Sequence, residues 1–131
     1  MEDQFYFLNN SKFYALHFLV HGIHHAFPSD FYRLVFPPIL GYPIVYIFFI
    51  TPLSVILTDS QYYPFLFGTA CMYLSYEMIH YHNHHSDPAE GTWLKEMKIY
   101  HMKHHYKNGV MGFGVSSRLW DKVFNTELRE I

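Results

Sequence analysis

Histidine is the residue type in this chain whose number and spacing could support chemistry. The sequence contains 11 histidines, and ten of them fall in three short clusters. The clusters read His21-Gly-Ile-His24-His25, His80-Tyr-His82-Asn-His84-His85 and His101-Met-Lys-His104-His105. Neutral imidazole is the commonest protein ligand for transition metals, so this crowding predicts a metal site.

The spacing within the clusters indicates how many imidazoles each helix can present. Residues three or four positions apart share one face of a helix, with Cβ atoms about 5–6 Å apart. Three helices would therefore offer three, two and three imidazoles, whereas His82 would point away from its neighbours. The eight candidate ligands are His21, His24, His25, His80, His84, His101, His104 and His105. Eight ligands are too many for one tetrahedral zinc ion and suit two neighbouring metal ions.

Composition and charge limit the class of protein. The chain has 131 residues, which we interpret as one domain over residues 1–131. Half of the residues are hydrophobic and only 15% are charged. The formal net charge of −2 gives no reason to expect nucleic acid as a partner. The single cysteine, Cys71, excludes an internal disulfide and a cysteine-based zinc site, and we expect it to be buried in an apolar helix.

Two apolar stretches predict a membrane hairpin over about residues 34–79. The first holds 24 residues without a charge, from 34 to 57, which is enough to cross a bilayer core of about 30 Å. Four prolines in this stretch predict a kinked span, which neighbouring helices in a membrane tolerate. The second stretch, Tyr62 to Ile79, is uncharged apart from Glu77 and leads directly into His80.

The hairpin also predicts where the histidines lie. A chain that crosses a membrane and returns brings the segments before and after the hairpin to the same face. All nine Lys and Arg residues lie outside the hairpin, and the connecting turn carries only Asp59, so this face is expected to be cytosolic. The predicted fold class is an all-α integral membrane domain, with a transmembrane hairpin and a cytosolic helical cap that carries a histidine-rich dimetal site.

Three further helices are predicted outside the hairpin. One runs from Ser11 to about Phe27, where a proline follows. A second runs from Trp93 to about Tyr106 with Thr92 as its N-cap, and a short closing helix covers residues 119–124. Between the last two, Gly112 and Gly114 are expected to serve backbone turns. We expect the lysines of the second helix to be exposed: Lys95, Lys98 and Lys103.

Taken together, these motifs resemble the membrane-bound fatty acid hydroxylase superfamily, most closely its fatty acid 2-hydroxylases. The resemblance rests on the three histidine clusters and on the motifs Phe36-Pro37-Pro38, Gly112-Phe113-Gly114 and Leu119-Trp120-Asp121. The resemblance is collinear from about residue 14 to residue 126. The superfamily also contains sterol desaturases and methyl oxidases, but the diproline and Gly-Phe-Gly stretches favour the 2-hydroxylase branch.

The resemblance implies an O2-dependent oxidoreductase that hydroxylates carbon 2 of long-chain fatty acyl groups for sphingolipid synthesis. It implies the eight histidines named above as ligands of two Fe ions, which zinc can replace in a purified protein, with O2 as co-substrate. It implies a free fatty acid or a ceramide as substrate and cytochrome b5 as electron donor. The expected location is the endoplasmic reticulum membrane, where the chain is multi-pass, contacts lipid and holds its metals on the cytosolic side. The resemblance implies that His85 is a neighbour of the ligands and not a ligand itself. The family commonly has Asp at the position of Glu77, which implies that Glu77 accepts a hydrogen bond from a ligand histidine.

One departure from the family pattern leaves alternatives open. The family has a further His-x-x-x-x-His pair upstream of the first cluster, and this sequence does not contain it, so we expect an N-terminally incomplete hydroxylase domain. The alternatives are a catalytically inactive, truncated metal-binding membrane protein and a hydroxylase of the sterol desaturase or methyl oxidase type. A ferritin-like carboxylate site would need a second Glu-x-x-His pair, and the chain has one.

Overall fold

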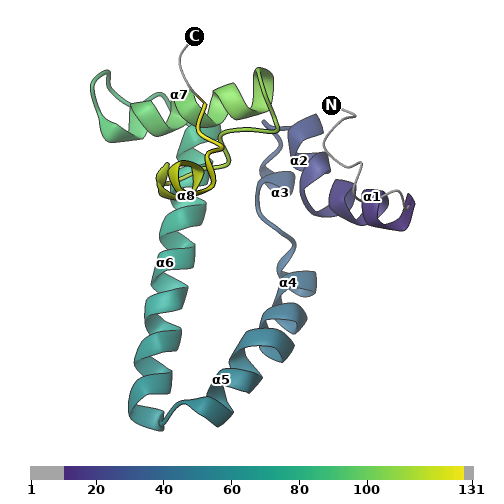
Figure 1. The fold of residues 1–131 in the computed structure, drawn as a ribbon, viewed down its shortest axis with the longest axis vertical. Helices are drawn as coiled ribbons and strands as arrows, with labels where there is room; N and C mark the ends of the chain where they lie inside the picture. Colours follow the sequence, from purple (N-terminus) through teal and green to yellow (C-terminus); the bar gives the residue numbers. More distant parts are fainter. Residues whose placement is uncertain (1–10, 129–131) are drawn as a thin grey trace. The chain divides into compact units, whose positions relative to one another are not determined.

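The computed structural model describes residues 11–128, which form helices and connecting segments with no strand among them (Figure 1). The predicted all-α class is therefore confirmed. The elements in chain order are α1 (Ser11–His17), η2 (Phe18–Gly22), α2 (Ile23–Ala26), α3 (Phe31–Leu34), α4 (Pro38–Val45), η3 (Tyr46–Ile50), α5 (Thr51–Ile56), α6 (Asp59–His85), α7 (Trp93–Tyr106) and α8 (Leu119–Phe124). Their contacts define two compact units, a histidine unit (residues 1–34 and 78–131) and an apolar unit (residues 35–77).

The first helical segment carries the first histidine cluster. It runs through α1, η2 and α2 and ends at Ala26, within one residue of the predicted end. The element η2 is a π-helical turn, which makes one turn of the helix wider than an α-helical turn. Phe27 leaves the helix with φ −136° and ψ 64°, and its backbone N–H donates to the carbonyl of Ile23 over 3.1 Å.

The apolar segment Phe31–Ile56 is long and hydrophobic enough to cross a membrane, and none of its most hydrophobic window is buried within the protein. Its helix is broken after Leu34 and widened at η3, as the prolines predict. The backbone N–H and the hydroxyl of Thr51 both donate to the carbonyl of Tyr46, the latter over 2.9 Å. These bonds satisfy a carbonyl of the π-helical turn η3, which ends at Ile50, two residues before Pro52.

The helix α6 contains 27 residues and includes the second predicted membrane stretch. At its start the backbone N–H of Thr58 donates to the side-chain oxygen of Gln61 over 3.2 Å, a capping contact. Among the residues described, Phe31–Ile56 is the one helical segment that meets the criterion for a membrane span. The second arm of the hairpin therefore stays a prediction.

The predicted burial of Cys71 is wrong, because its side chain is exposed on α6. Its neighbour Met72 is also 72% exposed. Apolar composition was the basis for expecting burial, but this helix presents that stretch on its outer surface. An outward apolar surface is the usual arrangement for a helix that contacts lipid.

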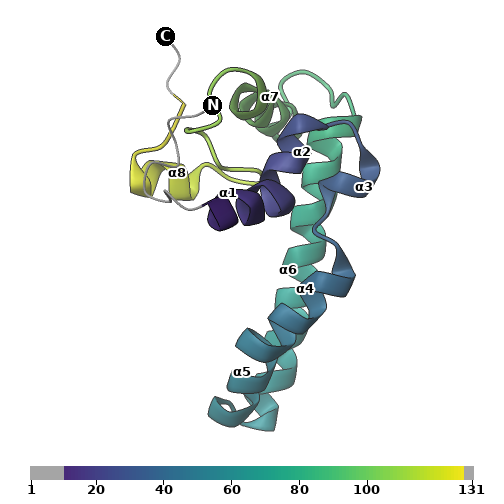
Figure 2. The same ribbon diagram turned by 90° about the vertical axis from the view of Figure 1, so that its right-hand side faces the viewer.

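The helix α7 begins and ends as predicted, and it lies across the C-terminal end of α6 (Figures 1 and 2). The hydroxyl of Thr92 accepts a hydrogen bond from the backbone N–H of Lys95 over 3.3 Å, which confirms the N-cap. The inner face is formed by four buried side chains at helical spacing, Met97, Tyr100, His101 and His104. This face directs the third histidine cluster into the histidine unit.

The lysines of α7 are half-buried, so the prediction that they are exposed is wrong. The ammonium of Lys95 lies 2.7 Å from a carboxylate oxygen of Asp87 and 2.9 Å from one of Glu90. The ammonium of Lys98 donates to the backbone carbonyl of Ser86. The two lysines thereby hold the loop between α6 and α7, a role that sequence spacing did not indicate.

Asp121 is the buried carboxylate that fastens α8 to the rest of the histidine unit. Its side chain is 2% exposed. One carboxylate oxygen accepts from the backbone N–H of Phe113 over 3.0 Å and from the hydroxyl of Thr126 over 2.7 Å. The other accepts from the backbone N–H of Gly114 over 2.8 Å and from the hydroxyl of Tyr100 over 3.0 Å. Four donors thus converge on one side chain, which links α7, α8 and the loop between them.

The two glycines of this loop have the backbone role that the sequence predicts. Gly112 has a φ of +72°, in the region that favours glycine. A Cβ at Gly114 would collide with the backbone carbonyl of Ser117 and lie 2.9 Å from a carboxylate oxygen of Asp121. Gly114 is therefore required because the chain approaches itself closely there.

We predict that Gly114→Ala lowers the free energy of unfolding by about 1–3 kcal/mol, because a backbone carbonyl cannot move aside for the added methyl group. Gly68→Ala is the matched control, since its Cβ would meet nothing within 4 Å in the interior of α6. There alanine should raise stability by up to about 1 kcal/mol. Denaturant unfolding in detergent measures both changes, and equal effects of the two substitutions would contradict the prediction.

Candidate metal centre

Eight imidazoles converge within the histidine unit in two groups. One group contains five histidines and the other contains three. Within each group, the candidate ligand nitrogens all lie within 4.8 Å of one another. The first group consists of His24, His80, His84, His101 and His105, and the second of His21, His25 and His104. These are the same eight residues that the sequence proposes as ligands.

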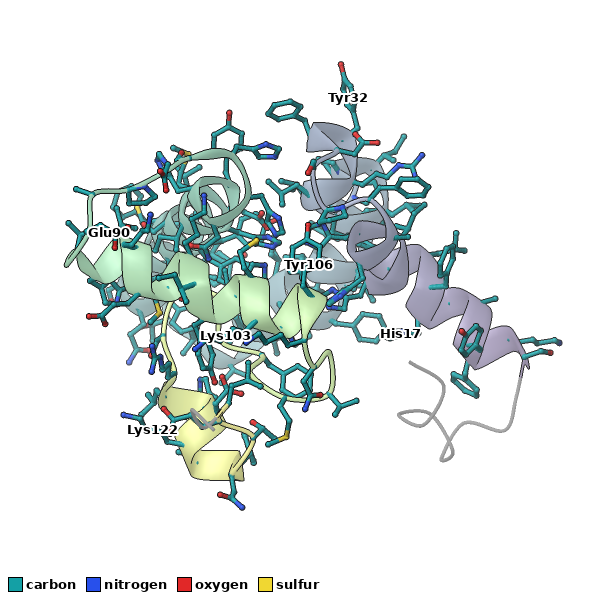
Figure 3. All side chains as sticks on the ribbon, turned by 90° about the horizontal axis from the view of Figure 1, so that it is seen from above. His17, Tyr32, Glu90, Lys103, Tyr106 and Lys122 are labelled. Atoms are coloured by element: carbon teal, nitrogen blue, oxygen red, sulfur yellow. The ribbon has the colours of Figure 1, made fainter. Side chains whose placement is uncertain are left out.

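Three helical segments bring these side chains together from distant parts of the sequence. The segment with η2 and α2 supplies three imidazoles, the last two turns of α6 supply two, and α7 supplies three. Figure 3 looks down on α7 and on the segment that carries α1 and α2, with imidazole rings between them. Each group takes histidines from more than one segment, so neither can form before the segments pack.

The nitrogens of the five-histidine group are arranged like ligands around a common centre. The Nε2 atom of His101 lies 3.1 Å from that of His80, 2.9 Å from that of His84 and 3.0 Å from that of His105. One imidazole nitrogen offers either one hydrogen or one lone pair, so it cannot satisfy three neighbours as hydrogen-bond partners. Adjacent ligands of a six-coordinate ion with bonds of about 2.1 Å lie roughly 3.0 Å apart, which fits this spacing.

His24 gives an independent test of whether a metal ion fits. Its side chain is 3% exposed, and neither ring nitrogen has a hydrogen-bond partner. Its ring centroid lies 4.9 Å from that of His80 and 4.8 Å from that of His105. A buried imidazole with two unsatisfied nitrogens is costly, and coordination of a metal ion by one nitrogen would remove much of that cost. The residues present therefore fit a bound metal ion.

The three-histidine group is held from outside by a backbone carbonyl. The Nε2 atom of His25 lies 2.8 Å from that of His21 and 3.2 Å from that of His104. The Nδ1 atom of His104 lies 2.8 Å from the carbonyl oxygen of Met111. Because a carbonyl only accepts, Nδ1 carries the hydrogen and the lone pair of Nε2 faces the group.

The ring of His25 also connects the two groups. It stacks on the ring of His105 with 4.2 Å between centroids and 27° between planes. A cavity of about 260 Å³ lies beside both rings. Its other lining residues belong to the end of α7 and the turn that follows, residues 106–110.

Burial lowers the pKa values of seven of the site histidines, and repulsion between neighbouring imidazolium charges adds to this effect. It lowers the pKa of His24 to about 4, the pKa values of His25, His80 and His84 to about 3, and the pKa of His105 to about 2. The pKa values of His21 and His101 are lowered for the same reasons. Neutral imidazole is the form that binds a metal ion, so these groups are ready to bind at neutral pH.

The remaining histidines lie outside both groups. The ring of His17 is 6.0 Å from that of His21, and Nδ1 of His82 lies 2.6 Å from the hydroxyl of Ser86. His85 stacks on Phe31 with 4.1 Å between ring centroids.

The structure assigns contacts to three polar groups near the candidate ligands. The carboxylate of Glu77 accepts a hydrogen bond from Tyr73 on the same helix, so its expected role towards a ligand histidine stays a prediction. Asn83 is fully buried and donates to the carbonyl of Val115 over 3.1 Å. Neither Asn83 nor the carbonyl of Met111 had a signal in the sequence.

Within residues 11–128 the fold and the site together define a helical protein with one candidate membrane-spanning segment and two histidine groups that could each hold a metal ion. A sequence profile of the fatty acid hydroxylase family matches residues 6–126, and the chain belongs to this family.

Relatives cover most of this chain. It is 39% identical over 122 residues to the fatty acid 2-hydroxylase of Rattus norvegicus, which is 93% of this chain and 32% of that protein. It is 41% identical over 118 residues to the ceramide very long chain fatty acid hydroxylase SCS7 of Saccharomyces cerevisiae, which is 88% of this chain and 29% of that protein. A solved structure described as full-length Scs7p, with only the hydroxylase domain visible, is similar with a TM-score of 0.79 and 40% identity. That match covers 88% of this chain and 43% of the other.

The lowered pKa values predict how the metal-free chain responds to acid. The ordinary histidine pKa is 6.5, whereas folding lowers it to about 4 for His24 and about 3 for His80. Between these values the unfolded chain binds more protons than the folded chain, so stability falls as the pH drops below about 6.5. The unfolding temperature of metal-free protein in detergent should therefore fall between about pH 7 and pH 5.

A variant with His80→Gln and His84→Gln should show a shallower fall, because two of the groups responsible are gone. His82→Gln, outside the site, should keep the full pH dependence. An unfolding temperature that does not change over this pH range would contradict the assignment of the site as a cluster of neutral imidazoles.

Proposed function

We propose that this chain is the metal-binding part of a di-iron oxygenase that hydroxylates carbon 2 of long-chain fatty acyl groups. The observation that carries the proposal is the convergence of eight imidazoles, four of them buried, in two adjacent groups. Two iron ions bound there would supply the O2-dependent oxidation of an unactivated C–H bond, which side chains alone cannot perform. Membership of the fatty acid hydroxylase family supports the same reaction class.

The chain's own residues would bind and orient the metals and limit access of water. In the proposed site the five-histidine group holds one ion and the three-histidine group holds the other. His24, His80, His101 and His104 are buried, so the centre is partly closed to solvent. Zinc is expected to take the place of iron when the protein is purified without iron, because imidazole ligands suit both metals.

The names of the relatives support an acyl substrate. They include a fatty acid 2-hydroxylase, a ceramide very long chain fatty acid hydroxylase and a dihydroceramide fatty acyl 2-hydroxylase of Arabidopsis thaliana, the last 40% identical over 114 residues. We therefore propose a free long-chain acid or a ceramide as substrate, and a role in sphingolipid synthesis. The exposed apolar segment Phe31–Ile56 supports a substrate that reaches the protein from a lipid phase.

The proposed location is the endoplasmic reticulum membrane, with a hairpin over about residues 34–79 and the metal centre on the cytosolic side. The candidate span supports the first arm of this hairpin. The placement of all nine Lys and Arg residues outside the hairpin supports the orientation. The proposed electron donor is cytochrome b5, docking on the basic C-terminal part of α7. Lys95, near the start of α7, pairs with two carboxylates, so we place the basic contact at the other end, at the half-buried Lys103 and the exposed Lys107.

Metal content and product analysis test the proposed reaction. The iron-loaded, detergent-purified chain should bind two metal ions and convert a long-chain acyl substrate to its 2-hydroxy product, identified by mass spectrometry. His101→Gln removes the imidazole whose Nε2 lies about 3 Å from three others of the five-histidine group. It should lower activity by at least the roughly 100-fold that loss of a hydrogen-bond partner of a ligand can cost. His82→Gln, which lies outside both groups, should keep metal and activity.

The other outcomes of this assay separate the alternatives. Two bound metals without turnover would favour the inactive metal-binding protein. Turnover of a sterol but not of an acyl chain would favour a hydroxylase of the sterol desaturase or methyl oxidase type. A chain that binds no metal under these conditions would contradict the proposal.

The docking of cytochrome b5 makes a separate prediction. Replacement of Lys103 and Lys107 by glutamate should slow reduction by cytochrome b5 by about tenfold at low salt, because attraction between opposite charges speeds encounter. The effect should shrink at high salt. Lys95→Gln is the control and should leave the reduction rate unchanged. Stopped-flow reduction of the iron-loaded protein measures the rates, and equal rates for all variants would exclude this docking surface.

A further inference from the structure

We propose that Asp121 is a positioning residue for the three-histidine group, fixing the tautomer and direction of His104 through the loop that precedes α8. The inference rests on the proposed metal-binding function. Asp121 itself touches no candidate ligand in either group. It acts through backbone groups of residues 111–114, which lie between its carboxylate and the imidazole of His104.

A continuous series of contacts joins the two side chains. The carboxylate of Asp121 holds the backbone N–H groups of Phe113 and Gly114 over 3.0 and 2.8 Å. Two residues earlier, the carbonyl of Met111 lies 2.8 Å from Nδ1 of His104. The ring of Phe113 also lies against that of His104, with 5.3 Å between centroids. The loop that Asp121 holds is thus the loop that contacts His104.

A second contact connects the same carboxylate to the helix that carries His104. The hydroxyl of Tyr100 donates to Asp121 over 3.0 Å, and Tyr100 lies one helical turn before His104 on α7. Both Tyr100 and Asp121 are 2% exposed. The loop and the helix therefore share one buried anchor, which fixes the carbonyl of Met111 relative to the imidazole that it orients.

The tautomer of His104 decides whether it can bind a metal ion through Nε2. With the hydrogen on Nδ1, donated to Met111, the lone pair of Nε2 faces His25 over 3.2 Å. If the loop moves away, Nδ1 loses its acceptor and the hydrogen can reside on Nε2, where it blocks coordination. His104 can therefore serve as the third ligand of the group only while Asp121 holds the loop in place.

The carboxylate is specifically required, because each of its two oxygens accepts from a different backbone N–H of the loop. An asparagine at this position has only one acceptor oxygen and one NH2 group. Whichever way the amide is turned, its NH2 faces one of the two backbone N–H groups and cannot accept from it. Asp121→Asn therefore releases one end of the loop while changing the side chain's size very little.

The test measures zinc affinity and the His104 tautomer on the detergent-purified chain. Zinc binding is followed by competition with a chromogenic chelator, and the tautomer by ¹H–¹⁵N correlation of the imidazole in the metal-free state, assigned with His104→Gln. Asp121→Asn should weaken zinc binding at the three-histidine group by about 10–100-fold and move the His104 signals towards the tautomer with hydrogen on Nε2. The five-histidine group should keep its affinity.

The matched control is Thr126→Val, which removes a donor to the same carboxylate and leaves both loop N–H bonds in place. It should keep the zinc affinity and the tautomer of the unsubstituted chain. Unchanged affinity and tautomer in Asp121→Asn would overturn the inference. Equal losses in both variants would also overturn it, since they would show general destabilisation. If the unsubstituted chain binds no zinc, the proposed function fails. The inference about Asp121 is then still decided by whether Asp121→Asn changes the His104 tautomer of the metal-free chain.

If Asp121→Asn does not fold, the unsubstituted protein supplies the test. If the position of the loop favours metal binding, thermodynamic linkage requires that metal binding favours this position of the loop to the same extent. Zinc binding should slow hydrogen exchange of the amides of Phe113 and Gly114, while the loop at residues 86–91 serves as the reference. Exchange at the two amides that does not respond to zinc would overturn the inference.

Discussion

The structure depends on the close packing of neutral imidazoles against one another. Eight histidines lie in two groups in which nitrogens approach to about the distances of hydrogen bonds, yet Nε2 of His101 faces three other imidazole nitrogens and cannot pair with all of them. Without a cation among them, such packing is unfavourable, because polar atoms leave water without full compensation. A bound ion at each group, as proposed, would make this packing favourable. Metal binding at this site would therefore raise the stability of the fold.

Much of the architecture could be predicted from local sequence. Thr92 specified where α7 begins, and the prolines specified an interrupted apolar segment. The eight convergent histidines followed from helical spacing, because three or four residues always return to the same face. The burial of Cys71 and the exposure of Lys95 were predicted wrongly, since each depends on which neighbours approach from elsewhere in the chain. The anchoring role of Asp121 was missed for a similar reason, as its partners Tyr100 and Thr126 have no shared pattern in the sequence.

The two histidine groups differ in how they are supported. The five-histidine group draws on three helical segments and includes the deeply buried His24 and His101. The three-histidine group is more exposed at His21 and is supported at His104 by a carbonyl in a loop. A site assembled from helices is held by many side-chain contacts at once, whereas a site supported by a loop depends on the few contacts that hold the loop. The difference explains why a buried carboxylate is placed under that loop.

The stacking of His25 on His105 would couple the two proposed metal sites to each other. His105 belongs to the five-histidine group and His25 to the other, and their rings lie 4.2 Å apart. An ion captured by the larger group would immobilise the ring of His105 and, through the stack, the ring beside it. The second group would then lose less conformational freedom when its own ion arrives. By the same reciprocity, an ion in the smaller group would favour binding in the larger one, so the proposed centre would fill cooperatively.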